Sequence, residues 1–521
     1  MQQQLTIKVL PSEAASEDIV KAYIAHHLAI KKSSVTGMTL IKRSLDARGR
    51  QPMYLLTLNA FIDEPFIQRK INKLQLADVS LSSKKIIIAG AGPAGLFAAL
   101  KLIEQGIKPI ILERGKDVRA RRRDLASLNK EGIINPESNY CFGEGGAGTY
   151  SDGKLYTRST KRGDVNRILN ILVQFGADEN ILYDAHPHIG TNKLPQIITA
   201  IRKAITDCGG DFLFDKKISD LEIKNNQLTG VITTDGNKFD GDALILATGH
   251  SARDIFLLLH KKNILIEAKP FALGVRVEHP QQLIDSIQYH CPARGEFLPP
   301  ASYGLVQQVD DRGVFSFCMC PGGIIAPAST APGELVVNGW SPSKRNNPYA
   351  NSGIVAAVNE KDFAHLNKKF GSLAAMEFQS EVEKKAFVHG GGNFVAPAQR
   401  LVDFTDKKLS SSLPDCSYVP GITPALMHDI LPSFIYTALQ GAFKEFGKKM
   451  KGYYTNEAIV VATESRTSSP VRIPRNTETL EHPQIKGLYP CGEGAGYAGG
   501  IVSAAMDGER VAEKISAFHH S

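Results

Sequence analysis

The sequence predicts an α/β fold in which a parallel sheet is interrupted by an inserted α+β domain and preceded by a small β-α-β-β domain. Three observations predict this fold. A glycine-rich turn joins an apolar strand to a helix near residue 90, later apolar strands end near 246 and 490, and the segment between them mixes strands and helices. We place the N-terminal domain at 1–80, the two parts of the dinucleotide-binding domain at 81–265 and 455–521, and the inserted substrate or cap domain at 266–454.

Composition fits a folded protein that works in the cytoplasm. Of 521 residues, 43% are hydrophobic and 22% are charged, which excludes a disordered chain. The formal charge of +8 is scattered, and the one dense basic run, "RARRRD" at 119–124, is typical of a solvated helix face. Seven cysteines lie far apart with no signal peptide before them, which indicates a reducing compartment. No apolar run reaches the roughly 20 residues of a membrane span.

The first 62 residues contain the signals of a separate small unit. The strand-like "LTIKVL" precedes Ser16, which can cap a helix whose apolar residues fall on one face. Two further strands, "MTLIKRSLDARG" and "PMYLLTLNAF", surround a turn. The polar segment 63–83 follows and is expected to be a linker, or a helix that lies across the next domain.

The turn after the apolar strand at 84–89 carries the pattern G-x-G-x-x-G. Gly90 makes the tight turn, Gly92 lets a pyrophosphate approach the backbone, and Gly95 lets the helix pack closely on the strand. Pro93 stands at the first helical position, and Glu113 ends the second strand, where a carboxylate meets a ribose hydroxyl. Strand, helix, turn and acidic residue agree, so this segment predicts a dinucleotide site in a Rossmann-like domain.

Later segments decide between NAD and FAD. Short strands in 216–254 lead into "ATG" at 247–249, and the strand in "GLYPCGEG" leads into a helix. This arrangement resembles the flavin-binding pattern of the glutathione reductase superfamily, which favours FAD. In that pattern the late acidic residue, here Glu493, approaches the ribityl or pyrophosphate part of FAD.

Two glycine-rich stretches, "CFGEGGAGTYSDGKL" from Cys141 and "PCGEGAGYAGGIVSAAMDGER" from Pro490, are interpreted as two walls of one flavin site. Small residues let backbone amides reach an extended, charged and planar ligand. The helix that begins after Gly500 would direct its positive end at the flavin ring. The residues expected to contact FAD are Gly90, Gly92, Pro93, Ala94, Gly95, Glu113, Arg114, Gly146, Ala147, Gly148, Ser151, Ile218, Ala247, Thr248, Gly249, Gly492, Glu493, Gly499, Gly500 and Ile501.

With these motifs in order, the chain resembles a known family. "SLDAR", "FGEGGAGTYSDGKL", "ILATGHSARD", "MCPGG", "NGWSPSKRNN", "ESRTSSPVRIPR" and "PCGEGAGYAGGI" are similar to the predicted FAD-dependent dehydrogenases of bacteria and plastids. The resemblance covers nearly the whole chain and implies a flavoprotein fold, bound FAD and an oxidoreductase. It implies no substrate, because a fold does not determine a reaction. No histidine or cysteine in 143–155 is placed for a covalent link, so FAD is expected to bind noncovalently.

The insert has no second dinucleotide motif. The candidates "CPGG" at Cys320 and "HGGGN" at His389 lack the preceding strand and the following amphipathic helix. The insert is therefore interpreted as a substrate or cap domain, and NAD(P)H could act only as a transient reductant. Arg345 and Arg466 lie in loops rich in small residues and are predicted to bind an anionic organic substrate for hydride transfer at the flavin. Structural ion pairs or surface positions are the alternative for both arginines.

Other chemistry is less favoured by the sequence. Cys318 and Cys320 are expected on one strand face as buried small hydrophobes, although Cys491 stands beside the predicted flavin loop. His186 and His188 lack the partners of a metal site, so none is expected. A flavin-dependent RNA-modifying protein and a non-catalytic FAD-binding protein remain alternatives to the enzyme, and the oligomeric state is not predicted.

Overall fold

The computed structural model describes residues 1–157 and 163–519. It begins with β1 (Gln2–Val9), α1 (Pro11–Ala14), α2 (Glu17–Leu28), β2 (Val35–Asp46) and β3 (Met53–Ile62). The three strands form an antiparallel sheet in the order β1-β3-β2, and Ser16 caps α2 by accepting a hydrogen bond from Ile19 N at 3.4 Å. The expected order of strand, helix and two strands is present, with α1 as an additional short helix.

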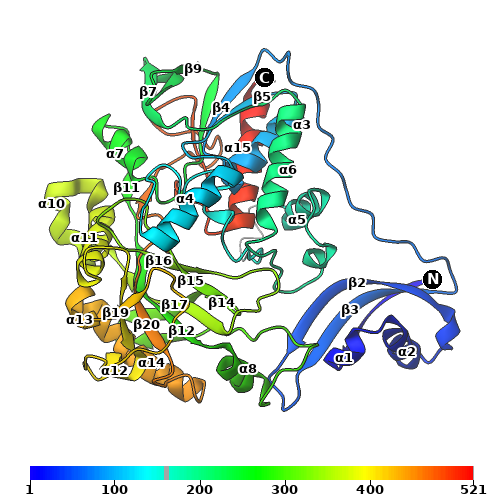
Figure 1. Cartoon of the computed structure of the whole chain (residues 1–521). Coiled ribbons are helices and arrows are strands. Elements are labelled where there is room, and N and C mark those ends of the chain that lie inside the picture. The colour runs from blue at the N-terminus through cyan, green and yellow to red at the C-terminus, as the bar shows by residue number, and fades with distance from the viewer. Residues whose placement is uncertain (158–162, 520–521) are drawn as a thin grey trace.

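The segment that follows, residues 63–84, contains neither helix nor strand. It runs as an extended trace along the outside of the molecule, from the N-terminal sheet to the start of β4 (Figure 1). The N-terminal sheet also contacts the rest of the chain through Arg43, whose Nε lies 2.7 Å from Asp184 Oδ1 and whose guanidinium lies 5.2 Å from the ring centre of Tyr183. The linker interpretation holds, and the alternative of a helix is wrong.

A five-stranded parallel sheet forms the centre of the part of the chain that the sequence predicts to bind a dinucleotide. Its order is β22-β10-β4-β5-β6, so the strands at its middle and its edge come from opposite ends of the chain. Apolar residues on both faces of these short strands explain why they are buried on both sides. The strands are β4 (Lys85–Ala89), β5 (Lys108–Leu112), β6 (Asp211–Leu213), β10 (Ala243–Leu246) and β22 (Leu488–Pro490).

Each face of this sheet is covered by different elements. Ile86 and Ile88 of β4 pack with helices on one face, whereas Ile87 and Ala89 pack with a small antiparallel sheet on the other. Figure 1 shows α15, α3 and α6 side by side on the helical face. The covering elements are α3 (Pro93–Glu104), α5 (Val165–Gln174), α6 (Leu194–Asp207) and α15 (Ile501–His519), and the small sheet is β7 (Ile218–Lys224), β8 (Gln227–Thr233) and β9 (Lys238–Asp240).

The insert is built on a seven-stranded sheet of order β13-β14-β17-β12-β20-β18-β19, in which only β18 and β19 pair in parallel among the described pairs. Its helices pack on this sheet around a second large core. The strands are β12 (Phe271–Pro280), β13 (Val306–Val309), β14 (Arg312–Cys320), β17 (Tyr349–Val358), β18 (Ala396–Arg400), β19 (Ile422–Pro424) and β20 (Ile459–Glu464).

The position of β20 corrects one predicted boundary. The sequence placed residues from 455 onward in the dinucleotide-binding part, but β20 pairs with β12 and β18 inside the seven-stranded sheet. The inserted sheet therefore reaches beyond residue 454, because a buried apolar run such as "IVVATE" fits either kind of sheet.

Further elements connect these sheets. Two short pairs of strands, β15 (Ile324–Pro327) with β16 (Val337–Trp340) and β11 (Glu267–Ala268) with β21 (Val471–Arg472), lie at their junction. Among the residues in 1–157 and 163–519, no helix has the length and apolar character needed to cross a membrane. The remaining α-helices of the described residues are α4 (Val118–Glu131), α7 (Arg253–Lys261), α8 (Gln281–Tyr289), α9 (Glu360–Phe363), α10 (Asn367–Phe370), α11 (Ala374–His389), α12 (Leu401–Thr405), α13 (Met427–Ile430) and α14 (Ser433–Lys449).

Candidate cofactor and substrate site

One cavity of about 730 Å³ lies between the parallel sheet and the seven-stranded sheet. Its volume is within the roughly 300–1,000 Å³ of small-molecule and cofactor sites. Both predicted arginines, Arg345 and Arg466, line it, and so do all the predicted cofactor residues except Gly95 and Gly492. Loops that are far apart in the sequence thus meet at the carboxyl ends of the parallel strands, where ligands of such sheets bind.

Four of the predicted cofactor glycines leave open space in this cavity. A Cβ added at Gly92, Gly249, Gly499 or Gly500 would meet no atom within 4 Å, and all four residues line the cavity. Gly92 is also the N-cap of α3 and offers no side chain to the free N–H groups of the first turn. Open space beside two helix N-termini suits an extended ligand with an anionic middle. These residues therefore fit FAD.

The two predicted glycines outside the cavity have packing roles. A Cβ at Gly95 would lie 2.0 Å from Gly90 O, so α3 can approach β4 only because Gly95 has no side chain. A Cβ at Gly492 would lie 2.9 Å from Ala94 Cβ, and its φ of +73° favours glycine. The packing role that the motif predicts for Gly95 agrees with this geometry.

Glu113 connects the two glycine-rich loops. Its carboxylate accepts hydrogen bonds from the backbone N–H groups of Ala91 (2.8 Å), Gly115 (2.9 Å) and Gly143 (2.9 Å). A carboxylate has about four acceptor positions, so a ribose hydroxyl can still be bound. Glu113 is therefore needed for the shape of the site as well as being available to a ligand.

The basic run at 119–124 contains a residue that the sequence interpretation placed wrongly. Arg121 is 0% exposed and donates to the carbonyl oxygens of Asn139 (2.8 Å), Tyr140 (2.9 Å) and Glu144 (2.8 Å). It therefore fixes the loop that leads to Gly146. The signal was available in the helix periodicity, because Arg121 shares a buried face with apolar residues of α4.

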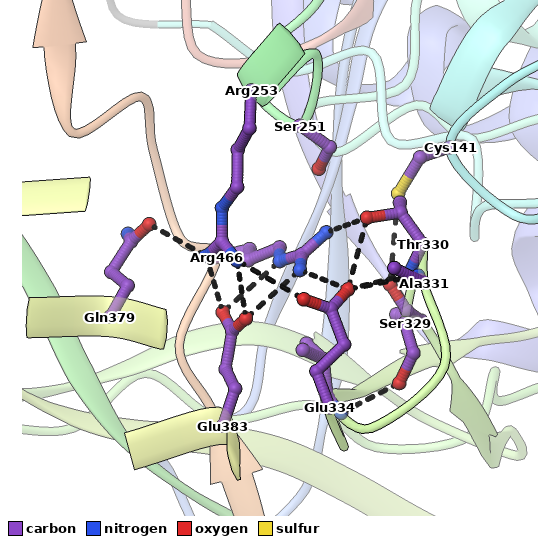
Figure 2. Close-up of polar contacts among 12 residues, drawn as sticks. Cys141, Ser251, Arg253, Ser329, Thr330, Ala331, Glu334, Gln379, Glu383 and Arg466 are labelled. Carbon is purple, nitrogen blue, oxygen red and sulfur yellow. Dashed lines mark hydrogen bonds and ion pairs between the residues drawn. The ribbon is translucent and has the colours of Figure 1, made fainter. Parts of the chain in front are cut away.

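Arg466 belongs to a four-charge cluster on the cavity wall. Its Nη2 lies 2.6 Å from Glu334 Oε1 and 2.9 Å from Glu383 Oε2, and its Nη1 donates to Thr330 Oγ1 at 2.7 Å. Arg253 pairs with the same two carboxylates at 3.1 and 2.9 Å. Figure 2 shows both guanidinium groups directed at Glu383 and Glu334. We call these residues the closed cluster, because two positive and two negative charges balance and are paired with one another.

The closed cluster changes the protonation of its neighbours. Arg253 and Arg466 outweigh the effect of burial and hold the pKa of Glu383 at about 2. Burial, assisted by the same two arginines, lowers the pKa of His250 to about 4, and His250 lines the cavity. The imidazole is therefore neutral at pH 7, and its Nδ1 lies 3.1 Å from Ser251 Oγ.

Arg345 belongs to a second group of charges on the same cavity. Its Nη2 donates to Asp152 Oδ2 at 2.8 Å, and Lys154 Nζ lies 3.8 Å from the same oxygen. We call Asp152, Lys154 and Arg345 the open cluster, because the described residues provide no hydrogen-bond partner for Asp152 Oδ1 or Arg345 Nε. The sequence reasoning missed Asp152 and Lys154, although two opposite charges flank a glycine in the quoted "YSDGKL".

A third acidic residue of the cavity is Glu493. Burial raises its pKa to about 7, and Lys269 only partly offsets this effect. The carboxyl therefore carries a proton in a substantial fraction of molecules at neutral pH, which suits contact with a ligand oxygen near an anionic group.

The cysteine prediction needs a correction. The register of β14 shifts between Phe317 and Cys320, so Cys318 is exposed toward the cavity while Cys320 is buried. Although Cys318 reaches the cavity, the protein atoms around its thiol remove it from bulk water, and this desolvation raises its pKa to about 11. Cys491 is buried, and burial raises its pKa well above the usual value. Both thiols are therefore protonated at neutral pH, and neither behaves as a thiolate.

Two family models match separate segments of the chain. A family described as "FAD-dependent protein, C-terminal domain-like" matches residues 270–467, and a domain of unknown function matches residues 1–61. A protein of Clostridium beijerinckii, described as "Uncharacterized protein", is 39% identical over 517 residues and covers 96% of each chain. The chain belongs to the family of this clostridial protein. The match to an FAD-dependent domain supports FAD as the cofactor of this protein.

Three solved structures show a limited similarity to the chain, each with a TM-score below 0.5. Glycine oxidase from Bacillus cereus shares 14% identity over 84% of this chain and 96% of that chain, with a TM-score of 0.30. A flavin-dependent brominase shares 12% identity over 84% and 80% of the two chains, with a TM-score of 0.36. The open conformation of a flavocytochrome c3 fumarate reductase shares 12% identity over 84% and 79%, with a TM-score of 0.32.

Proposed function

We propose that the protein is an FAD-dependent oxidoreductase that acts on a small anionic organic substrate in the cavity. The observation that carries this proposal is that one cavity joins the open glycines, Gly92, Gly249, Gly499 and Gly500, to the partly unpaired guanidinium of Arg345. The first feature suits an extended dinucleotide, and the second suits an anion. Dehydrogenation by hydride transfer is the reaction class we assign, and the domain division of the chain is part of the proposal.

The residues of this chain would hold FAD through the backbone more than through side chains. The first turn of α3 would bind the pyrophosphate, Glu113 would accept a hydrogen bond from a ribose hydroxyl, and the first turn of α15 after Gly500 would lie beside the flavin ring. FAD, when bound, supplies a two-electron acceptor or donor. Arg345 would orient the substrate beside it, and residues of the seven-stranded sheet would form the opposite wall of the cavity. NAD(P)H has no second nucleotide motif to bind and is proposed only as a transient reductant.

The test begins with the purified protein. We expect it to be yellow and to release FAD on treatment with acid, with one FAD for each chain. Recovery of FMN, of flavin attached to a peptide, or of no flavin after refolding with FAD would contradict the proposal. Anaerobic reduction by NADH, NADPH and a panel of organic acids, followed through the flavin absorbance, then identifies the reductant.

A further inference from the structure

The open cluster contains a buried carboxylate with one oxygen unused. Asp152 is 4% exposed, and both of its cationic neighbours lie on Oδ2, at 2.8 Å for Arg345 and 3.8 Å for Lys154. Burial opposes its ionisation, but Lys154 and Arg345 outweigh burial and hold the pKa of Asp152 below the usual value. An ionised, buried oxygen requires a donor. The hydroxyl of Ser341, which also interacts with this carboxyl, donates its proton to Pro321 O at 3.0 Å.

Arg345 has a buried hydrogen-bond donor that lacks an acceptor among the described residues. Within the described part of the chain, its Nε is buried without an acceptor, and the side chain is 14% exposed. Its φ is +48°, a left-handed conformation that is strained for an arginine. Cys318, on the same cavity, has a φ of +44°. The chain therefore holds this wall in an unfavourable conformation, which is common where a ligand must be positioned.

The charges of the open cluster do not balance. Lys154 and Arg345 contribute two positive charges and Asp152 one negative charge. His188 is neutral at pH 7, because burial and then Arg345 lower its pKa to about 4. The adjacent Arg276 is balanced by Glu464 at 2.8 Å. A ligand with one net negative charge would neutralise this group, whereas a zwitterion would leave it positive.

A ligand that meets these conditions has a carboxylate for the cations and a hydrogen-bond donor for Asp152. Resting on the proposed function, we propose that the open cluster selects a 2-hydroxy carboxylate, with its carboxylate on Arg345 and Lys154 and its hydroxyl donating to Asp152 Oδ1. An amino acid could donate to Asp152 as well, but it carries no net charge and leaves one cation uncompensated.

The position in the fold agrees with this assignment. Asp152 follows the loop 146–148, and a Cβ at Gly148 would meet Pro93 at 3.4 Å and Ile501 at 3.6 Å. Pro93 and Ile501 begin α3 and α15, so Asp152 follows closely in the chain after a glycine that lies between the two helix N-termini. A hydroxy acid held here would adjoin the proposed flavin end of the cavity.

The test uses the FAD-loaded protein and matched acids. Each 2-hydroxy acid of increasing chain length is titrated against the acid that lacks the hydroxyl and the corresponding 2-amino acid, and binding is followed through the absorbance of the bound flavin. We expect at least one hydroxy acid to bind about tenfold more tightly than its two analogues, as a charged hydrogen bond in a buried site allows. In Asp152→Asn this preference should fall below about threefold.

Matched variants distinguish a specific loss of the preference for hydroxy acids from a general effect of substitution on the protein. Arg345→Gln should weaken the hydroxy acid and the deoxy acid by the same factor, because both lose the carboxylate contact. Asp184→Asn alters another Arg–Asp pair, which lies outside the cavity lining, and should leave the preference unchanged. If Asp152→Asn does not fold, the comparison of acids on the unaltered protein still tests whether the site prefers a hydroxy acid.

The outcomes distinguish the two proposals. A protein that binds no FAD overturns the proposed function. A protein that binds FAD but shows equal affinity for the hydroxy and deoxy acids, or no response to any carboxylate, overturns the role of Asp152 alone. Tighter binding of the amino acid would overturn the argument from charge balance and the choice of a hydroxyl group.

Discussion

The closed and open clusters lie on one cavity and differ in how completely their charges are used. In the closed cluster, Arg466 and Arg253 share Glu334 and Glu383, and the charges sum to zero. In the open cluster, Asp152 and Arg345 each keep a buried polar atom without a partner in the described structure. The difference teaches that an arginine beside a cavity is a candidate ligand anchor only if its donors are free.

The same distinction applies to the glycines. A Cβ at Gly95 would clash with Gly90 O, whereas a Cβ at Gly92, in the same motif, would face open space. The first position serves folding and the second is free to serve a ligand. Substitutions in the two charge clusters and at the two glycines can therefore test separately which groups serve folding and which are free for a ligand.

The largest expected effect is loss of the closed cluster. Glu383→Ala leaves the buried Arg466 and the half-buried Arg253 with one carboxylate between them, and breaking a buried ion pair costs about 3–5 kcal/mol. We expect a marked fall in the denaturation midpoint. Glu381→Ala, on the exposed side of the same helix, is the control and should change stability by less than about 0.5 kcal/mol. Equal midpoints for the two variants would show that the closed cluster does not hold the fold.

Acid is expected to protonate Glu383 and thereby break the ion pairs of the closed cluster. The pKa of Glu383 is lowered from 4.5 to about 2, so its contribution to stability is complete above pH 4.5 and is lost as pH falls toward 2. We expect the denaturation midpoint of the unaltered protein to fall across this window. In Glu383→Gln the fall should be shallower, and parallel curves would contradict the assignment.

The glycine pair is expected to separate folding from ligand binding. Gly95→Ala brings a Cβ to 2.0 Å from Gly90 O and should lower stability by about 1–3 kcal/mol through overpacking. Gly92→Val should preserve the fold, because the space is open and its φ of −77° is allowed, but should reduce the FAD content after purification. Full FAD occupancy in Gly92→Val would show that no ligand passes this glycine.

The smallest effect is expected in the open cluster. Arg345→Lys keeps the charge but loses the planar fork and the Nε donor, so flavin reduction by the anionic substrate should slow about tenfold, or about 1.4 kcal/mol, while FAD stays bound. Arg43→Lys, outside the cavity lining, is the matched control. An unchanged rate in Arg345→Lys would remove this arginine from the site.

Sequence patterns could predict what depends on short segments. The turn from Gly90 to Ala94, the "ATG" at 247–249 and part of the late glycine stretch border the cavity. These contacts could be predicted because each pattern reflects a local backbone requirement. Pairings between distant segments could not be predicted in the same way. Nothing in "ESRTSSPVRIPR" shows that Arg466 is neutralised by Glu383 of α11, and nothing in "RARRRD" alone shows that Arg121 is buried.

The strand order of the parallel sheet has a consequence for how the protein is made. β10 lies between β4 and β22, but β22 and α15 follow the whole seven-stranded sheet in the chain. During synthesis, one edge of β10 therefore stays unpaired until β22 has been made, and an unpaired edge can associate with foreign strands. Residues of α15 also line the cavity, so the proposed FAD site stays incomplete until this helix has been synthesised.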